Sequence, residues 1–365
     1  MTREELEFIS CHSSIYTKVI LFSLNVNGIS MHSSNILKCI AGTIFHVFVI
    51  FSVIKSLACI LYGKDVIDYY VGMLISTIFT IILWWTLFFQ KKHFFELTQH
   101  LTFRKLQEEF SPVKTILVVL VVILIFPPTI MCFDIARTIS RNVPRRSNHT
   151  SCRSYWLNTN NAYVRVLLTV HESVLSYTNY IVFFTSFLMF SICGILLLKQ
   201  LTETEKKIPF INASAAWREL NYYTLAFKKM ERNMSFPLFL LISKIVVDIF
   251  NAVSRFTAHE RAASTKRLFM ISTPQITIWF VTIVILGDLL QTKGLTVSDA
   301  IYESLNRQGG VKNLGYYEYK KIKSTMNLTV WKLFKINRNL LLSTIAFITT
   351  YGVIITQFQF SSNGN

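Results

Sequence analysis

Long apolar stretches, separated by polar and basic ones, dominate the pattern of this sequence. Each holds about 18 or more mostly apolar residues, within the range that a helix needs to cross the hydrocarbon core of a bilayer. The seven stretches are Leu37–Tyr62, Tyr69–Gln90, Val113–Ile135, Val164–Leu198, Phe236–Val253, Leu268–Leu290 and Asn339–Phe360. Within lipid, backbone polar groups must be paired internally, and the stretches show no alternation of period two that would indicate a β-barrel. The pattern therefore predicts an all-α membrane protein with seven transmembrane helices.

Composition supports a bilayer as the solvent of these helices. Of the 365 residues, 52% are hydrophobic and only 16% are charged, whereas a soluble domain carries about 25% charged residues. The first residues, Met1–Ile9, are acidic and mixed, unlike a signal peptide. We therefore expect the first apolar stretch to be retained as a true membrane span.

The basic residues predict the orientation of the chain in the membrane. The net charge of +17 could indicate a nucleic-acid partner, but the basic residues are scattered between the apolar stretches rather than gathered on one domain. With a cytoplasmic N-terminus, 24 basic residues lie inside and 11 outside. Basic residues favour the cytoplasmic side. The sequence thus predicts a cytoplasmic N-terminus and an extracellular C-terminus, the reverse of a rhodopsin-like G-protein-coupled receptor.

The loop after the third stretch carries two candidate modifications. Asn148 begins a sequon for N-glycosylation, and this topology places it outside the cell. Cys132 and Cys152 fall on the same oxidising side. They either form a disulfide or remain free thiols, because spacing alone does not fix connectivity.

Two cytoplasmic segments, Trp217–Arg232 and Tyr316–Asn337, have the apolar spacing of helices. In the second, one face carries Ile322, Met326, Val330 and Leu333. Such a helix could lie on the anionic inner leaflet, pack against partner helices or simply be solvated. These alternatives remain open from the sequence.

Polar and aromatic residues inside the spans are candidates for a ligand site. Ionisable groups at membrane depth are functional candidates by default, and aromatic walls with a few polar groups are typical of small-molecule sites. The candidates are His171, Glu172, Tyr177, Tyr180, Asn251, Gln275 and Trp279. Lys244 and Asp248, four residues apart, either belong to a site or form a self-satisfied pair. His171-Glu172 has no second histidine at metalloprotease spacing, and the sequence contains no Gly-rich phosphate loop and no Cys/His metal cluster. We therefore expect no enzyme, metal or cofactor.

The last apolar stretch ends TTYGVIITQFQF, in which Thr350-Tyr351 precedes Gln357-Phe358 by five apolar or small residues. Thr350 and Gln357 lie two helical turns apart and share one face. Polar residues in a span face protein or water. They either hold helices together or line a narrow pore, in which Phe358 would form a hydrophobic constriction.

This motif resembles the C-terminal signature of the insect gustatory receptor family, and the seven spans, topology and length agree with it. The resemblance implies a tetramer whose last helices line a central cation pore, with ligand bound between the outer halves of the other helices. Gly352 stands where sugar receptors of this family often carry an acidic residue. The resemblance therefore favours a bitter or other non-sugar tastant.

The resemblance implies that the chain is a tastant-gated cation channel subunit in the plasma membrane of chemosensory neurons. Its expected partners are a small-molecule tastant, the lipid bilayer, permeating cations and other gustatory receptor subunits. The expected division is a cytoplasmic segment (1–36), a six-helix ligand-sensing domain (37–290), a cytoplasmic loop with an anchor helix (291–338), and the pore-lining helix with an extracellular tail (339–365). A secondary transporter and a G-protein-coupled receptor are the alternatives.

Overall fold

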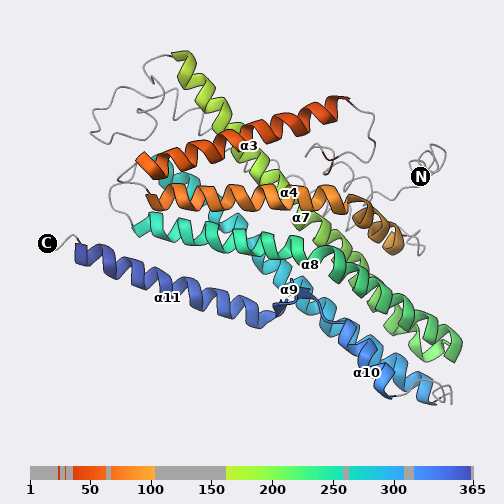
Figure 1. The fold of residues 1–365 in the computed structure, drawn as a ribbon. Helices are drawn as coiled ribbons and strands as arrows, with labels where there is room; N and C mark the ends of the chain where they lie inside the picture. Colours follow the sequence, from red (N-terminus) through yellow and green to blue (C-terminus); the bar gives the residue numbers. More distant parts are fainter. Residues whose placement is uncertain are drawn as a thin grey trace.

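Helices make up nearly all of the described structure (Figure 1). The computed structural model describes residues 36–62, 67–102, 162–257, 263–307 and 316–362, together with Leu24 and Ile29. The α-helices in these ranges are α3 (Ile36–Tyr62), α4 (Ile67–Thr102), α7 (Ala162–Lys207), α8 (Ala213–Thr257), α9 (Ala263–Arg307), α10 (Tyr316–Thr325) and α11 (Arg338–Ser362). The remaining elements are the 3₁₀ helix η1 (Ile208–Phe210) and the strands β1 (Thr329–Val330) and β2 (Phe334–Lys335). The predicted all-α class is confirmed.

Six of the seven predicted spans fall on α3, α4, α7, α8, α9 and α11. The remaining predicted span, Val113–Ile135, lies outside the described residues, as do Cys132, Asn148 and Cys152. In the described part of the chain, α4, α7, α8 and α9 are each long and apolar enough to cross a membrane. Shorter apolar segments lie in α3 and α11.

The three longest helices extend well beyond a bilayer. Helix α7 has 46 residues, and α8 and α9 have 45 each. At 1.5 Å per residue each is about 68 Å long, roughly twice the hydrocarbon thickness. Figure 1 shows α7, α8 and α9 continuing together past the start of α11 to the region where α10 joins them. The predicted segment Trp217–Arg232 is therefore helical, but it is the first part of α8 and runs into the span without a break.

Helix α7 forms the centre of the bundle. Every residue from Val182 to Gly194 is buried, and α4, α8 and α9 all pack against it. A helix that is apolar on all sides is stable only when it is surrounded. The sequence of this part of α7, VFFTSFLMFSICG, fits that position because its few polar residues are small hydroxyls.

Buried hydrogen bonds join α4, α7 and α8 in the part of the bundle that extends past the spans. The Gln200 side chain on α7 donates from Nε2 to the Leu101 carbonyl of α4 over 2.5 Å and accepts from the Tyr222 hydroxyl of α8 over 3.0 Å. The Tyr223 hydroxyl reaches the Gln200 carbonyl, also over 3.0 Å. Leaving one such buried partner unpaired costs about 1–3 kcal/mol. These bonds fix the relative register of the three helices.

The predicted helix Tyr316–Asn337 is wrong in its second half. Helix α10 ends at Thr325, and β1 and β2 then pair as a short antiparallel hairpin, with Val330 opposite Phe334. Trp331 and Lys332 make the turn with φ of 48° and 58°. Tertiary contacts override the helical spacing here. The Glu231 carboxylate of α8 accepts from the Thr329 backbone N–H over 2.7 Å, and Ser235 Oγ accepts from the Trp331 N–H over the same distance.

Candidate functional site

Tyr180, Gln275 and Trp279, three of the predicted ligand-binding residues, meet between α7 and α9. The Gln275 amide donates to the Tyr180 hydroxyl. The Trp279 ring lies 5.2 Å from that of Tyr180, 5.7 Å from that of Phe184 and 5.4 Å from that of Phe187, measured between centroids. We call these five residues the aromatic cluster.

Helical spacing explains how the aromatic cluster forms. Tyr180, Phe184 and Phe187 follow one another at steps of four and three, so they project from one face of α7. Gln275 and Trp279 are four residues apart and share one face of α9. Both α9 side chains are buried, at 8% and 6% exposed. The result is a packed group of aromatic rings with a hydroxyl and an amide, the residue types that line sites for small organic ligands.

One buried polar atom on α7 has no hydrogen-bond partner in the described part of the chain. The side-chain oxygen of Asn179, next to Tyr180, is buried and accepts no hydrogen bond from the described residues. A buried acceptor without a donor costs about 1–3 kcal/mol. A ligand with a hydroxyl or amine could supply the missing donor.

The other predicted ligand-binding residues are placed only by their helices. His171, Glu172 and Tyr177 belong to α7 and Asn251 to α8. Their side chains lie outside the described part of the structure, so their role stays a prediction.

Lys244 and Asp248 form the self-satisfied pair that was one of the two predicted interpretations. The Lys244 ammonium group donates to the Asp248 carboxylate within α8. It also lies 4.9 Å from the centroid of the Phe183 ring on α7. The two side chains are 13% and 22% exposed, so they face the bundle. Neutralising each other is a sufficient reason for two charges at membrane depth.

Helix α11 contacts the rest of the described chain along one edge only. It packs against α8 and α9, and Thr344 is the only residue of its first 17 that is fully buried. The large apolar side chains left exposed on it are Leu342, Ile345, Phe347, Tyr351, Val353 and Ile354. Such a surface must be covered by lipid or by protein.

The side chains of Thr350, Tyr351 and Gln357 are all exposed, and Tyr351 also contacts α8. The Thr350 hydroxyl donates to the Ala346 carbonyl over 2.8 Å. The Tyr351 ring contacts Phe347 at 4.4 Å and, edge to face, Phe250 of α8 at 6.5 Å. Of Phe358, the structure describes only its place in the helix.

Sequence reasoning missed the polar contacts that fasten the start of α11 to α9. Gln291 Nε2 donates to the Ile336 carbonyl over 2.5 Å, and Arg338 Nε donates to Asp288 Oδ2 over 2.8 Å. Gly287, one turn before Gln291, lets Ile336 approach the α9 backbone. Asp288 and Gln291 stand three residues apart at the end of an apolar stretch, which is the one signal that could have indicated a docking face.

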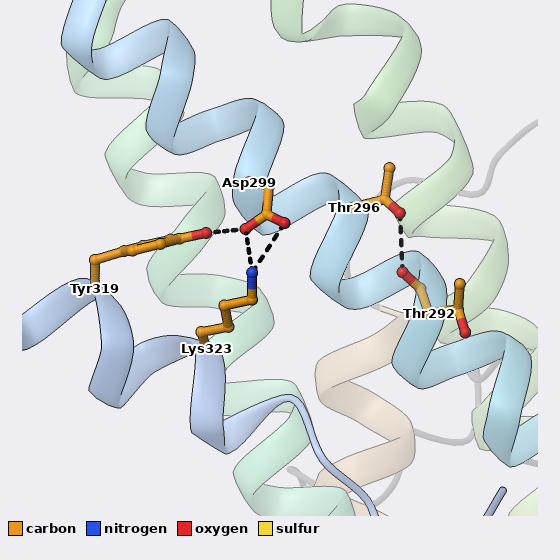
Figure 2. Close-up of polar contacts among 5 residues, drawn as sticks. All are labelled: Thr292, Thr296, Asp299, Tyr319 and Lys323. Carbon is orange, nitrogen blue, oxygen red and sulfur yellow. Dashed lines mark hydrogen bonds and ion pairs between the residues drawn. The ribbon is translucent and has the colours of Figure 1, made fainter. Parts of the chain in front are cut away.

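A second missed contact holds α10 against α9, and Figure 2 shows it. Asp299 on α9 accepts from the Tyr319 hydroxyl and from Lys323 Nζ, whose distances to the two carboxylate oxygens are 2.9 and 3.0 Å. The Tyr319 ring also stacks on Tyr302 at 4.0 Å. The sequence left open whether this helix lies on the inner leaflet, packs against partner helices or is solvated. In the structure α10 packs against the helices α8 and α9.

Comparison with known protein families and with curated proteins finds no sequence match. Among solved structures, the fold is similar to that of the insect olfactory receptor OR5 from Machilis hrabei, determined alone and in complex with eugenol. In both cases the TM-score is 0.70 at 13% identity, over 96% of this chain and 100% of that one. The likeness shows that the chain has the fold of this insect olfactory receptor.

Proposed function

We propose that this chain is a gustatory receptor, a tastant-gated cation channel subunit of a chemosensory neuron. The observation that carries the proposal is helix α11. It has an apolar surface that the rest of the described chain leaves open, and this surface includes Thr350 and Gln357. Polar side chains on the open face of a spanning helix need water or another protein chain beside them.

A symmetric assembly of several copies supplies both the water and the neighbouring protein chain. If several copies bring their α11 helices around one axis, the exposed apolar residues contact one another and the polar ones face a central path. The family resemblance implies a tetramer. In this arrangement Phe358 forms the constriction that keeps the closed pore dry, and Gln357 offers amide oxygens to hydrated cations when the helices spread. Tyr351, which contacts Phe250 of α8, acts in packing.

The aromatic cluster supports a small-molecule ligand. It combines aromatic rings with the Gln275 amide and the Tyr180 hydroxyl, and the oxygen of Asn179, the residue before Tyr180, accepts no hydrogen bond from the described residues. The protein of the compared structure binds eugenol, a small organic molecule. We propose that a tastant binds here and with His171, Glu172, Tyr177 and Asn251. It opens the channel by binding more tightly to the open state. Gly352 favours a non-sugar tastant.

The taste assignment rests on the Thr350-Tyr351 and Gln357-Phe358 pairs, which match the gustatory signature. The basic residues support a cytoplasmic N-terminus in a multi-pass plasma-membrane protein. With this topology α11 ends outside the cell, and glycosylation at Asn148 would occur on the same side.

Current recordings test the proposal. Cells expressing the chain, alone or with candidate co-subunits, are exposed to a panel of tastants under voltage clamp. We expect an inward cation current with at least one tastant. If the chain reaches the cell surface in every combination but no tastant produces current, and G-protein signalling or tracer uptake responds instead, the channel proposal is wrong.

A further inference from the structure

The turn of the β1–β2 hairpin carries a large aromatic residue to the surface. Trp331 is 53% exposed and Leu333 is 63% exposed, with the exposed Lys332 between them. Both Trp331 and Lys332 have a positive φ, a backbone region that costs a bulky side chain energy. Hairpin turns of this kind ordinarily use Asn or Gly. A Trp-Lys pair in this position therefore calls for an explanation beyond the turn itself.

The contacts of Trp331 place it beside the start of two apolar helix segments. Its ring lies 5.5 Å from Phe236 and 4.9 Å from Phe239, both on α8 and both only half-buried. These two residues begin the apolar part of α8. Six residues after the turn, the chain enters the apolar helix α11 at Arg338. The apolar parts of α8 and α11 thus begin beside the turn, and in membrane proteins Trp is typically found at the boundary where spans begin.

Basic residues flank this aromatic surface. Arg232 is exposed and precedes Phe236 by one turn, so it lies on the same face of α8, on the side away from the apolar part. Lys332 is exposed at the turn. The nearby acid Glu231 is engaged by the Thr329 backbone and hydroxyl.

Arg232 also lies 3.5 Å from His93 Nδ1, which in turn lies 3.5 Å from the exposed carboxylate of Glu96. Lys332 and Arg232 therefore supply the positive charge of this surface, with Glu96 as the exposed acid on the side of His93.

We infer that this surface, made by Arg232, Phe236, Phe239 and the turn Trp331–Leu333, binds the headgroup region of anionic phospholipids. Trp331 and Leu333 enter the boundary between headgroups and acyl chains. Lys332 and Arg232 extend toward phosphate and carboxylate groups. A helix on the anionic leaflet was one of three alternatives that the sequence left open for this segment; in our inference the hairpin turn, rather than α10, takes that place. Because the hairpin leads directly into α11, bound lipid also steadies the start of that helix.

Tryptophan quenching tests the depth of the turn without relying on channel activity. The purified full-length chain is placed in nanodiscs whose phosphatidylcholine is brominated on the first acyl carbons. The chain has six tryptophans, so the Trp331 signal is the difference between the parent and Trp331→Phe. We expect Trp331→Phe to lose part of the quenchable emission. Trp217→Phe is the control. Trp217 lies 19 residues before Phe236 on the same helix, about 28 Å away, and its removal should instead raise the quenchable share.

Lipid selectivity tests the charges. Native mass spectrometry measures retention of phosphatidylserine from mixed nanodiscs. Lys332→Ala and Arg232→Ala should each weaken it about fivefold, the effect of one basic residue near an anionic surface. Lys320→Ala, which removes an exposed charge from α10, should leave it unchanged.

Either of two results overturns the inference. One is equal quenching of the parent and Trp331→Phe, confirmed with Trp331→Tyr in case the first variant folds poorly. The other is unchanged phosphatidylserine retention in both charge variants. If the turn is instead covered by a second copy of the chain, Trp331 escapes quenching and Leu333→Arg changes the oligomeric mass. Failure of the channel proposal would leave all of these readouts unaffected.

Discussion

Replacing Gly287 with alanine tests how tightly the hairpin is packed against α9. A Cβ atom at this position would lie 2.5 Å from Ile336 Cγ2 and 3.0 Å from Ile336 Cβ. Ile336 cannot easily retreat, because its side chain is fully buried and its carbonyl accepts the Gln291 hydrogen bond. Gly287→Ala therefore forces the hairpin and the start of α11 away from α9.

The expected cost combines two opposing terms. Overpacking of this kind costs about 1–3 kcal/mol, while exchanging glycine for alanine inside a helix gains about 0.5–1 kcal/mol. Gly42 on α3 is the matched control, since the nearest side-chain atom to its added Cβ is Trp84 Cζ2 at 3.9 Å. Both substitutions gain the same stabilisation from placing alanine instead of glycine in a helix, so this gain cancels when the two variants are compared. The free energy of unfolding should thus be about 1–3 kcal/mol lower for Gly287→Ala than for Gly42→Ala.

Unfolding of the purified chain in mixed micelles, titrated with a denaturing detergent, measures this difference. Adding Ile336→Ala removes the clashing methyl group. In a double-mutant cycle the two changes should therefore cost less together than the sum of their separate effects. Equal stability of Gly287→Ala and Gly42→Ala, with additive effects in the cycle, would refute the packing of the hairpin on α9.

Three further predictions concern orientation, ligand and gate. A C-terminal epitope tag should bind antibody on intact cells; access only after permeabilisation would contradict the topology. Gln275→Leu and Trp279→Ala should each raise the tastant concentration for half-maximal current about tenfold, since each removes a contact worth 1–2 kcal/mol; unchanged dose–response curves would exclude the aromatic cluster as the site. Phe358→Ala should raise the resting current, and Gln357→Glu should increase the preference for divalent cations. Both currents are normalised to the amount of protein at the cell surface. Variants that conduct like the parent would disprove the gate assignment.

Apolar stretches predict the spans well because lipid imposes one rule on every residue of a crossing helix. They locate the helix ends poorly. Lys206 and Lys207 still belong to α7, and α9 continues through Lys293 to Arg307. Packing of α7, α8 and α9 on one another stabilises these extensions, and no local signal in the sequence marks where that packing stops.

The hairpin was beyond prediction for a related reason. Ile322, Met326 and Val330 do have helical spacing, but Glu231 and Ser235, about 100 residues earlier, bind the backbone of the segment and hold it extended. A pattern within one segment cannot reveal such distant partners.

In the candidate site, too, the residues could be predicted but their contacts could not. Tyr180, Gln275 and Trp279 could be predicted as site residues because polar and aromatic groups are conspicuous inside apolar stretches. Their direct contact, however, depends on the relative rotation of α7 and α9. The role of Asp299 could not be predicted, because a charged residue outside the spans resembles any other surface residue. Only the structure shows that Tyr319 and Lys323 donate hydrogen bonds to it.

The most direct test of the proposed function is conduction by the purified chain alone in a planar lipid bilayer. The proposal predicts unitary cation currents whose open probability rises with tastant concentration, and a reversal potential that shifts in Gln357→Glu. A chain that binds a tastant and retains its oligomeric mass, yet passes no current at any voltage, would contradict a pore lined by its last helix.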